Sequence, residues 1–420
     1  MKETMIKWMK QNFWNILIWG STAFFTFLYI TLLFNQNVWT DEIYTLKLIE
    51  NNFSKLLEEA SLSQHPPLYY LTAKAARLVF GDSLLVQKTV ALVPLSLTLV
   101  LGATKVRYLF SDKVSFLFIM ILGCIPCSME FAVQVRMYSM ALLAVTTCGL
   151  YAYECYITEK KSVWFCFVLS AVAAAYLHYF ALGSVMIICG LLFLFLVFFH
   201  REKLKIWLLS IVIMVVSYLP WLRVFIQQIA GVSEGYWIPE ITVDTIWGYF
   251  KWTFGINKWD WPCYIFTLLS VFAGIVVLVG VIHRRKDDVY AFLCMLVPTL
   301  TAIAGIVISL VSSPVYRDQY VFPSIGMFCL FLSIALSRFM QKKCAFLIGP
   351  VCLFLIFMGA VQYLETWRQE YKSTLTDQTV AFWNENVGKN DIIVYNGLPL
   401  NFVILIIFRK KNCSMYGMWI

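Results

Sequence analysis

Long apolar stretches constrain this chain more than any other feature of its sequence. A helix needs about 20 apolar residues to cross the hydrocarbon core of a bilayer. Eleven candidate spans are predicted, near 14–34, 85–106, 114–131, 137–157, 163–181, 183–199, 206–222, 263–282, 289–311, 320–337 and 345–363. Hydrophobic residues make up 60% of the chain and charged residues 14%, against roughly 45–50% and 25% in soluble domains. This composition excludes an ordinary soluble enzyme, a disordered chain and a fibrous protein.

The distribution of basic residues predicts the direction of the spans. With the N-terminus placed in the cytoplasm, the N-terminal segment and five alternate short loops carry 17 of the 33 Lys and Arg residues. Such an excess marks cytoplasmic loops. The net charge of +9 is therefore attributed to topology. No basic patch is set in a soluble module, so no nucleic-acid partner is expected. An odd number of spans places the C-terminal tail on the extracytoplasmic side.

The predicted spans hold almost no ionisable residue near the middle of the membrane. A transporter or proton pump usually places charges at bilayer depth along its pathway. Glu154 lies near a cytoplasmic end, whereas Glu130 and Arg136 lie at outer ends. The sequence therefore places any chemistry at the outer surface.

The first outer segment, 35–84, is the most informative. It opens with Asp41 and Glu42 directly after the first span, and apolar residues then recur at spacings of three and four up to Ala60. That pattern predicts one amphipathic helix lying on the membrane. Adjacent carboxylates at the mouth of an apolar bundle repel each other and are partly desolvated, and both effects raise the pKa of a carboxyl toward that of a general base. The alternative is a solvated helix N-terminus, where acidic residues favour the dipole.

A second motif follows this helix. His65-Pro66-Pro67-Leu68-Tyr69-Tyr70 contains two prolines that turn the chain back toward the bilayer. The order of span, Asp-Glu pair, amphipathic helix and His-Pro-Pro-Leu-Tyr-Tyr resembles the integral-membrane GT-C glycosyltransferases. The resemblance is to the branch of the protein O-mannosyltransferases and the bacterial lipid A aminoarabinose transferases. It implies an all-α bundle of about eleven spans with juxtamembrane helices on the outer face.

The resemblance also implies a reaction. Such enzymes transfer a sugar from a polyprenyl phosphate carrier to an acceptor hydroxyl outside the cytoplasmic membrane. In that scheme Asp41 is the general base, and Glu42 positions the acceptor or supports Asp41. Arg136 is the first candidate to hold the phosphate, because a guanidinium grips phosphate with two donors. The acceptor, whether glycan, lipid or protein, is not specified.

Further candidates for substrate binding come from the same segments. Arg136-x-Tyr138 and Tyr176-Leu177-His178-Tyr179-Phe180 resemble two other elements of the family. The complete set of predicted substrate-binding residues is His65, Tyr69, Lys74, Lys88, Arg136, Tyr138, His178, Tyr179 and Arg317. Arg317 carries little weight, since relatives often place Arg directly before a Tyr, and here Gln319 holds that place before Tyr320.

Metal and redox sites are not indicated. The outer histidines with Asp41 and Glu42 match no metal-ligand template, so no cofactor is predicted. Cys124 and Cys127 form a CxxC inside an apolar helix, where cysteines act as small hydrophobes.

Two regions complete the predicted organisation. The outer segment 223–262 is rich in aromatic residues, which suit sugar stacking or a lipid groove, or form an interfacial belt. Residues 1–363 are assigned to the transmembrane domain and 364–420 to a short extracytoplasmic tail. The tail contains an expected strand at 391–395 and reads as an incomplete α/β domain.

Two other classes compete with a glycosyltransferase. A polysaccharide polymerase or ligase also has many spans, but that class would use basic residues of its outer loops more than an acid pair after the first span. A flippase or transporter predicts midplane charges and repeat symmetry, and neither is visible in the sequence. A scaffold without activity is a further alternative, for which Asp41 would be dispensable.

Overall fold

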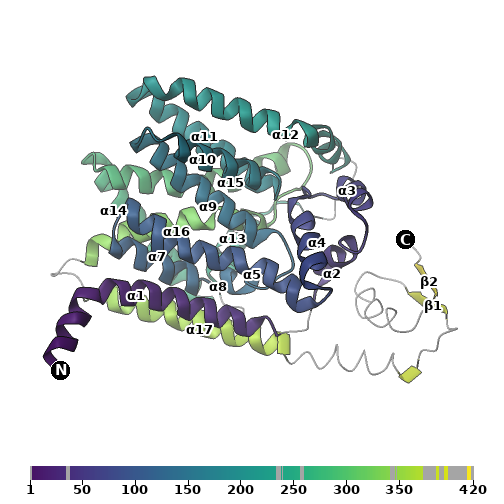
Figure 1. Ribbon diagram of the computed structural model, residues 1–420, viewed down its shortest axis with the longest axis horizontal. Coiled ribbons are helices and arrows are strands. Elements are labelled where there is room, and N and C mark those ends of the chain that lie inside the picture. The colour runs from purple at the N-terminus through teal and green to yellow at the C-terminus, as the bar shows by residue number, and fades with distance from the viewer. Residues whose placement is uncertain are drawn as a thin grey trace.

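The computed structural model describes most of the chain. The described residues are 2–34, 38–232, 238, 240–255, 260–340, 346, 348–371, 385–386, 392–395 and 414–417. Within them the fold is a helical bundle with a cap of short helices at one end (Figure 1). Buried apolar side chains join nearly all of its helices into one core.

Nine helical stretches among these residues are long and apolar enough to cross a bilayer. They are Gln11–Leu32 in α1, Leu84–Leu109, Tyr138–Ile157 (α9), Tyr179–Phe199 (α11), Arg201–Gly231, Trp261–Ile282 (α14), Lys286–Val311 (α15), Asp318–Met340 and Ile348–Trp367. The first helix as a whole is α1 (Lys2–Leu32), and α5 is Leu84–Leu101, α12 Leu204–Val232, α16 Ile325–Ser337 and α17 Ile348–Tyr371. The chain is therefore a multi-pass membrane protein.

The predicted count of eleven spans is not confirmed. Two predicted spans form shorter helices. One of them is α10 (Lys161–Ala175), which ends before the predicted limit of residue 181. The other is divided into α7 (Asp112–Cys124) and α8 (Pro126–Phe131). The division has a clear cause, because the residue before a proline avoids the helical region, and Ile125 is extended with φ −65° and ψ 137°.

The cap consists of α2 (Thr40–Leu48), α3 (Phe53–Leu62) and α4 (Leu68–Phe80). The prediction of one amphipathic helix over this region is wrong, since the chain forms two. The break lies at Asn52, whose side-chain oxygen accepts a hydrogen bond of 2.9 Å from the Lys55 amide and so starts a second helix. Figure 1 shows the three helices grouped at one end of the bundle, away from the N-terminus.

Several charged side chains have partners at helix ends remote from this cap. Lys203 donates to the carbonyls of Cys155, Tyr156 and Thr158, at 3.1, 2.7 and 2.9 Å, and thereby satisfies the end of α9. Lys105 pairs with Glu154, and Arg338 pairs with the fully buried Asp288. Each of these charges therefore has a partner, as a low-dielectric surrounding requires.

The aromatic segment contains α13 (Val243–Phe254), followed by the described start of α14. Trp252 packs on Phe131 and Phe322, with ring centroids 5.4 and 6.2 Å apart, and so joins α13 to the bundle. Residues 233–237 and 256–259 of this segment, with three of its aromatic side chains, lie outside the described residues.

The C-terminal tail is described only in part. The last helix, α17, continues past the predicted boundary at residue 363 to Tyr371. The expected strand is confirmed as β1 (Ile392–Tyr395), which pairs in parallel with β2 (Ser414–Gly417). The remaining tail residues, including the apolar run 402–408, fall outside the part of the chain that is described.

Close packing between α9 and α16 generates a testable prediction. A Cβ at Gly326 would lie 2.0 Å from the Thr146 hydroxyl oxygen and 3.1 Å from its Cβ, and a β-branched side chain has little freedom to move away. We expect Gly326→Ala to cost about 1–3 kcal/mol. Thermal unfolding in detergent measures this against Gly274→Ala, where nothing lies within 4 Å. Equal melting temperatures for the two variants would contradict the packing argument.

Candidate active site

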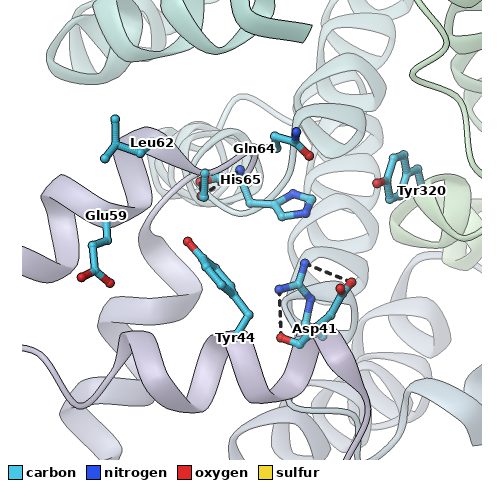
Figure 2. Close-up of a pocket in the computed structure, with 9 residues that line it drawn as sticks. Asp41, Tyr44, Glu59, Leu62, Gln64, His65 and Tyr320 are labelled. Carbon is cyan, nitrogen blue, oxygen red and sulfur yellow. Dashed lines mark hydrogen bonds and ion pairs between the residues drawn. The ribbon is translucent and has the colours of Figure 1, made fainter. Parts of the chain in front are cut away.

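Asp41 lies in the first turn of α2, beside a buried arginine. An Arg136 Nη2 atom lies 3.6 Å from Asp41 Oδ2, and Nη1 donates to the Asp41 backbone carbonyl at 3.4 Å (Figure 2). The arginine side chain is 3% exposed, whereas that of Asp41 is 36% exposed. The carboxylate therefore remains accessible to a substrate while its partner is fixed inside the protein.

Arg136 comes from the short loop between α8 and α9. Its Nη1 also lies 3.4 Å from the Thr45 hydroxyl. Its Nε finds no hydrogen-bond acceptor in the described part of the chain. A buried guanidinium with an unused donor can gain a hydrogen bond from an anionic ligand.

Glu42 joins the two segments that carry Asp41 and Arg136. Its Oε1 accepts a hydrogen bond of 2.7 Å from the Val135 amide, and its Oε2 accepts one of 3.0 Å from the Trp39 amide. The side chain is buried and is not part of the cavity that Asp41 lines. This geometry suits a residue that positions its neighbours.

A polar cavity of about 480 Å³ opens beside the Asp41–Arg136 pair. Its walls include His65 together with residues that sequence reasoning did not select: Tyr44, Glu59, Leu62, Ser63, Gln64 and Tyr320. Figure 2 shows Tyr44 and Glu59 on the helices of the cap, with Tyr320 across the cavity. Ser63 and Gln64 directly precede the His-Pro-Pro motif, which is the local signal that could have identified them.

An apolar groove of about 470 Å³ adjoins this cavity. Both share Gln64, His65 and Tyr320 as lining residues. The groove runs between α11, α12 and α15, and its walls include Met186, Ile229 and Ile308 along with the predicted residues His178 and Tyr179. Tyr179 is held by a hydrogen bond to Gln228 and by one of 3.3 Å from the Trp221 indole.

Three rings lie where the polar cavity meets the groove. The His178 ring packs against His65 and Tyr320, at centroid distances of 5.2 and 5.0 Å, and those two rings are 6.3 Å apart. Burial, and next the charge of Arg136, lowers the pKa of His178 from 6.5 to about 3. The same causes lower the pKa of His65 well below its usual value. Both imidazoles are therefore neutral near pH 7.

Six predicted residues do not appear among the described lining residues of either hollow: Glu42, Tyr69, Lys74, Lys88, Tyr138 and Arg317. Lys74 donates to the carbonyl of Ile49 at 3.0 Å and so caps the end of α2. The Tyr138 hydroxyl accepts a hydrogen bond of 3.1 Å from the side-chain Nε2 of Gln319. Tyr69 and Lys88 are buried in α4 and α5, and Arg317 directly precedes the 3-10 helix η3 (Asp318–Ser324).

A metal site is not formed by the described residues, which contain no group of three or more His, Cys, Asp or Glu side chains placed to bind an ion. Cys124 and Cys127 are buried at the junction of α7 and α8. The residues that line the cavity offer the carboxylates of Asp41 and Glu59, the Arg136 guanidinium, hydroxyl groups and the imidazole of His65.

The bridging role of Glu42 can be tested. Glu42→Ala leaves the Val135 and Trp39 amides without their acceptor, and an unpaired N–H that is buried, as that of Val135 is, costs about 1–3 kcal/mol. We expect a clearly lower melting temperature in detergent, with Glu58→Ala, an exposed carboxylate on α3, as the control. A variant as stable as the control would show that Glu42 does not hold these segments together.

Comparison with solved structures identifies the fold. Comparison with protein-family models gives no match, and comparison with curated protein sequences gives none. The structure is similar to that of ArnT from Cupriavidus metallidurans in the apo state, with a TM-score of 0.63 and 11% identity, over 97% of this chain and 86% of that one. It is also similar to the same protein bound to undecaprenyl phosphate, with a TM-score of 0.60 and 13% identity, over 96% of this chain and 86% of that one. The predicted all-α membrane bundle is thereby confirmed, with a fold like that of ArnT.

Proposed function

We propose that this protein is a membrane glycosyltransferase. It transfers a sugar from a polyprenyl-phosphate-linked donor to an acceptor hydroxyl on the extracytoplasmic face of the membrane. Asp41 serves as the general base, Arg136 holds the phosphate, and His65, His178 and Tyr179 line the path of the donor lipid. Glu42, Lys74 and Tyr138 act as positioning residues around them.

The observation that carries this proposal is that the polar cavity and the apolar groove adjoin and share three lining residues. A lipid-linked sugar has a polar head, a phosphate and an apolar chain in that order. The Asp41–Arg136 pair lies in the polar cavity, and the groove begins at His65 and Tyr320. That one solved structure of this fold is bound to undecaprenyl phosphate further supports a lipid phosphate as ligand.

The proposed step balances without a further reactant. The acceptor oxygen attacks the sugar carbon while its proton passes to Asp41. The bond from that carbon to the phosphate oxygen breaks, and its electron pair leaves with the polyprenyl phosphate. The transition state has oxocarbenium character at the sugar carbon. Arg136 stabilises the charge that develops on the leaving phosphate.

The direction of the protein in the membrane follows from charge. The basic residues Lys105, Lys203 and Arg338 lie at helix ends remote from the cap, where Lys105 and Arg338 pair with acidic residues. Cytoplasmic ends of spans carry such an excess of Lys and Arg. We therefore assign the cavity to the extracytoplasmic side.

Removal of the base tests the reaction. We expect wild-type protein in detergent to release polyprenyl phosphate from one member of a panel of polyprenyl-phosphate sugars presented with candidate acceptors. Asp41→Asn should reduce this turnover at least about 100-fold, while Glu58→Gln should not. Turnover that is equal in Asp41→Asn and wild type would remove Asp41 from the mechanism. Donor binding without turnover in either protein would favour a lipid transporter or scaffold.

The groove is tested separately by filling it. Gly183 lines the groove, and a Cβ added there would meet no atom within 4 Å, so Gly183→Phe should occupy the groove without straining α11. We expect the KM for a long-chain donor to rise about tenfold or more, equivalent to about 1.4 kcal/mol. Gly274→Phe on α14 is the matched control, since its site is also open but lies outside the described groove lining. An unchanged KM in Gly183→Phe would exclude the groove as the lipid site.

A further inference from the structure

The proton on His178 is fixed by the way α11 begins. His178 is the N-cap of this helix, and its Nδ1 accepts a hydrogen bond of 3.1 Å from the Phe180 amide. An accepting Nδ1 carries no proton, so a neutral imidazole must carry its proton on Nε2. In this tautomer, the other side of the ring can only donate a hydrogen bond.

That donor is buried and unused. His178 is 2% exposed, and its Nε2 has no acceptor among the residues that the structure describes. A buried N–H without a partner has lost its hydrogen bond to water and gained none in return. A ligand oxygen placed here would restore that hydrogen bond.

The surroundings of His178 define which oxygen could reach it. His178 lines the apolar groove beside His65 and Tyr320, the two rings that also line the polar cavity. Arg136 lines the polar cavity together with His65 and Tyr320, so the guanidinium faces the same junction. The hydrocarbon chain of a lipid phosphate has no hydrogen-bond acceptor. If the chain lies in the groove, the phosphate oxygens at its end are the first acceptors near His178.

We propose that His178 Nε2–H donates a hydrogen bond to a phosphate oxygen of the lipid carrier, next to Arg136. This inference rests on the proposed function and adds a residue with a defined role. Arg136 supplies the positive charge that faces the phosphate. His178 is neutral, so it adds no second cation and contributes one hydrogen bond of fixed orientation. His178 therefore fixes the phosphate at the point where the groove meets the polar cavity.

Two substitutions separate this role from helix capping. His178→Asn keeps a good N-cap acceptor but has no atom at the position of Nε2. His178→Gln places an amide donor near the Nε2 position, but Gln is a poorer N-cap. His178→Asn thus removes the Nε2 donor and keeps the N-cap, whereas His178→Gln keeps a donor and weakens the N-cap. Both variants can be compared in full-length protein in nanodiscs.

Binding of three probes identifies the acceptor atom. We expect His178→Asn to weaken binding of undecaprenyl phosphate about tenfold or more, with the affinity for undecaprenol unchanged within about twofold and the melting temperature retained. His178→Gln should bind undecaprenyl phosphate within about threefold of wild type and melt at a lower temperature. Inorganic phosphate should bind far more weakly than the lipid phosphate.

Each contrary result has a definite meaning. Equal affinity of wild type and His178→Asn for undecaprenyl phosphate would overturn the assignment and leave the proposed function intact. Equal losses for undecaprenol and undecaprenyl phosphate would show that His178 acts on the groove and not on the phosphate. If inorganic phosphate competes as strongly as undecaprenyl phosphate, the claim that the bound phosphate belongs to a lipid would be overturned. Failure of wild type to bind undecaprenyl phosphate at all would overturn the proposed function itself.

The tautomer can be observed directly. The chain has 4 histidines, so ¹⁵N-histidine labelling gives a simple imidazole spectrum that His178→Asn assigns. We expect His178 to appear at pH 7 as the neutral form with its proton on Nε2, and the Nε2–H signal to shift when undecaprenyl phosphate is added. A proton on Nδ1, or no shift with the ligand, would contradict the proposal.

Discussion

The bridge made by Glu42 is the interaction on which the candidate site depends. One carboxylate accepts the Val135 amide at the loop before α9 and the Trp39 amide at the start of α2. The residues next to these contacts are Arg136 and Asp41, which lie 3.6 Å apart across the same junction. Because the Glu42 side chain and its hydrogen bond to Val135 are buried, water competes poorly for that donor. A local helix start is thereby tied to a distant loop, across a separation of 93 residues in sequence.

The membrane explains why the remaining polar groups lie where they do. Backbone and side-chain polar atoms at bilayer depth must find partners inside the protein, as the hydrogen bond from the Tyr29 hydroxyl to the Gly123 carbonyl illustrates. The buried charged pairs Lys105–Glu154 and Arg338–Asp288 lie at helix ends remote from the cap, and the cavity lies at the cap end. An apolar groove between α11, α12 and α15 adjoins this cavity, so a lipid chain and a polar head group can lie next to each other.

The sequence was sufficient for those features that follow from local periodicity and spacing. The apolar runs predicted a helical membrane bundle, and Asp41, His65 and Arg136 do lie around one cavity. The break of the cap at Asn52 was missed because the apolar periodicity of α2 continues across it. Tyr320 comes from a distant segment and faces the site only through the packing of η3 on α9 and α11, which no local pattern encodes. Lys74 was chosen for its charge, but its contact with the end of α2 could be seen only in three dimensions.

The most direct test of this account is a structure of the protein in nanodiscs with undecaprenyl phosphate, determined by electron cryomicroscopy. The account predicts density for the phosphate beside Arg136 and His178, with the chain running along the groove past Met186 and Ile308. Density for the chain on another face of the bundle, or a phosphate distant from Arg136, would contradict it.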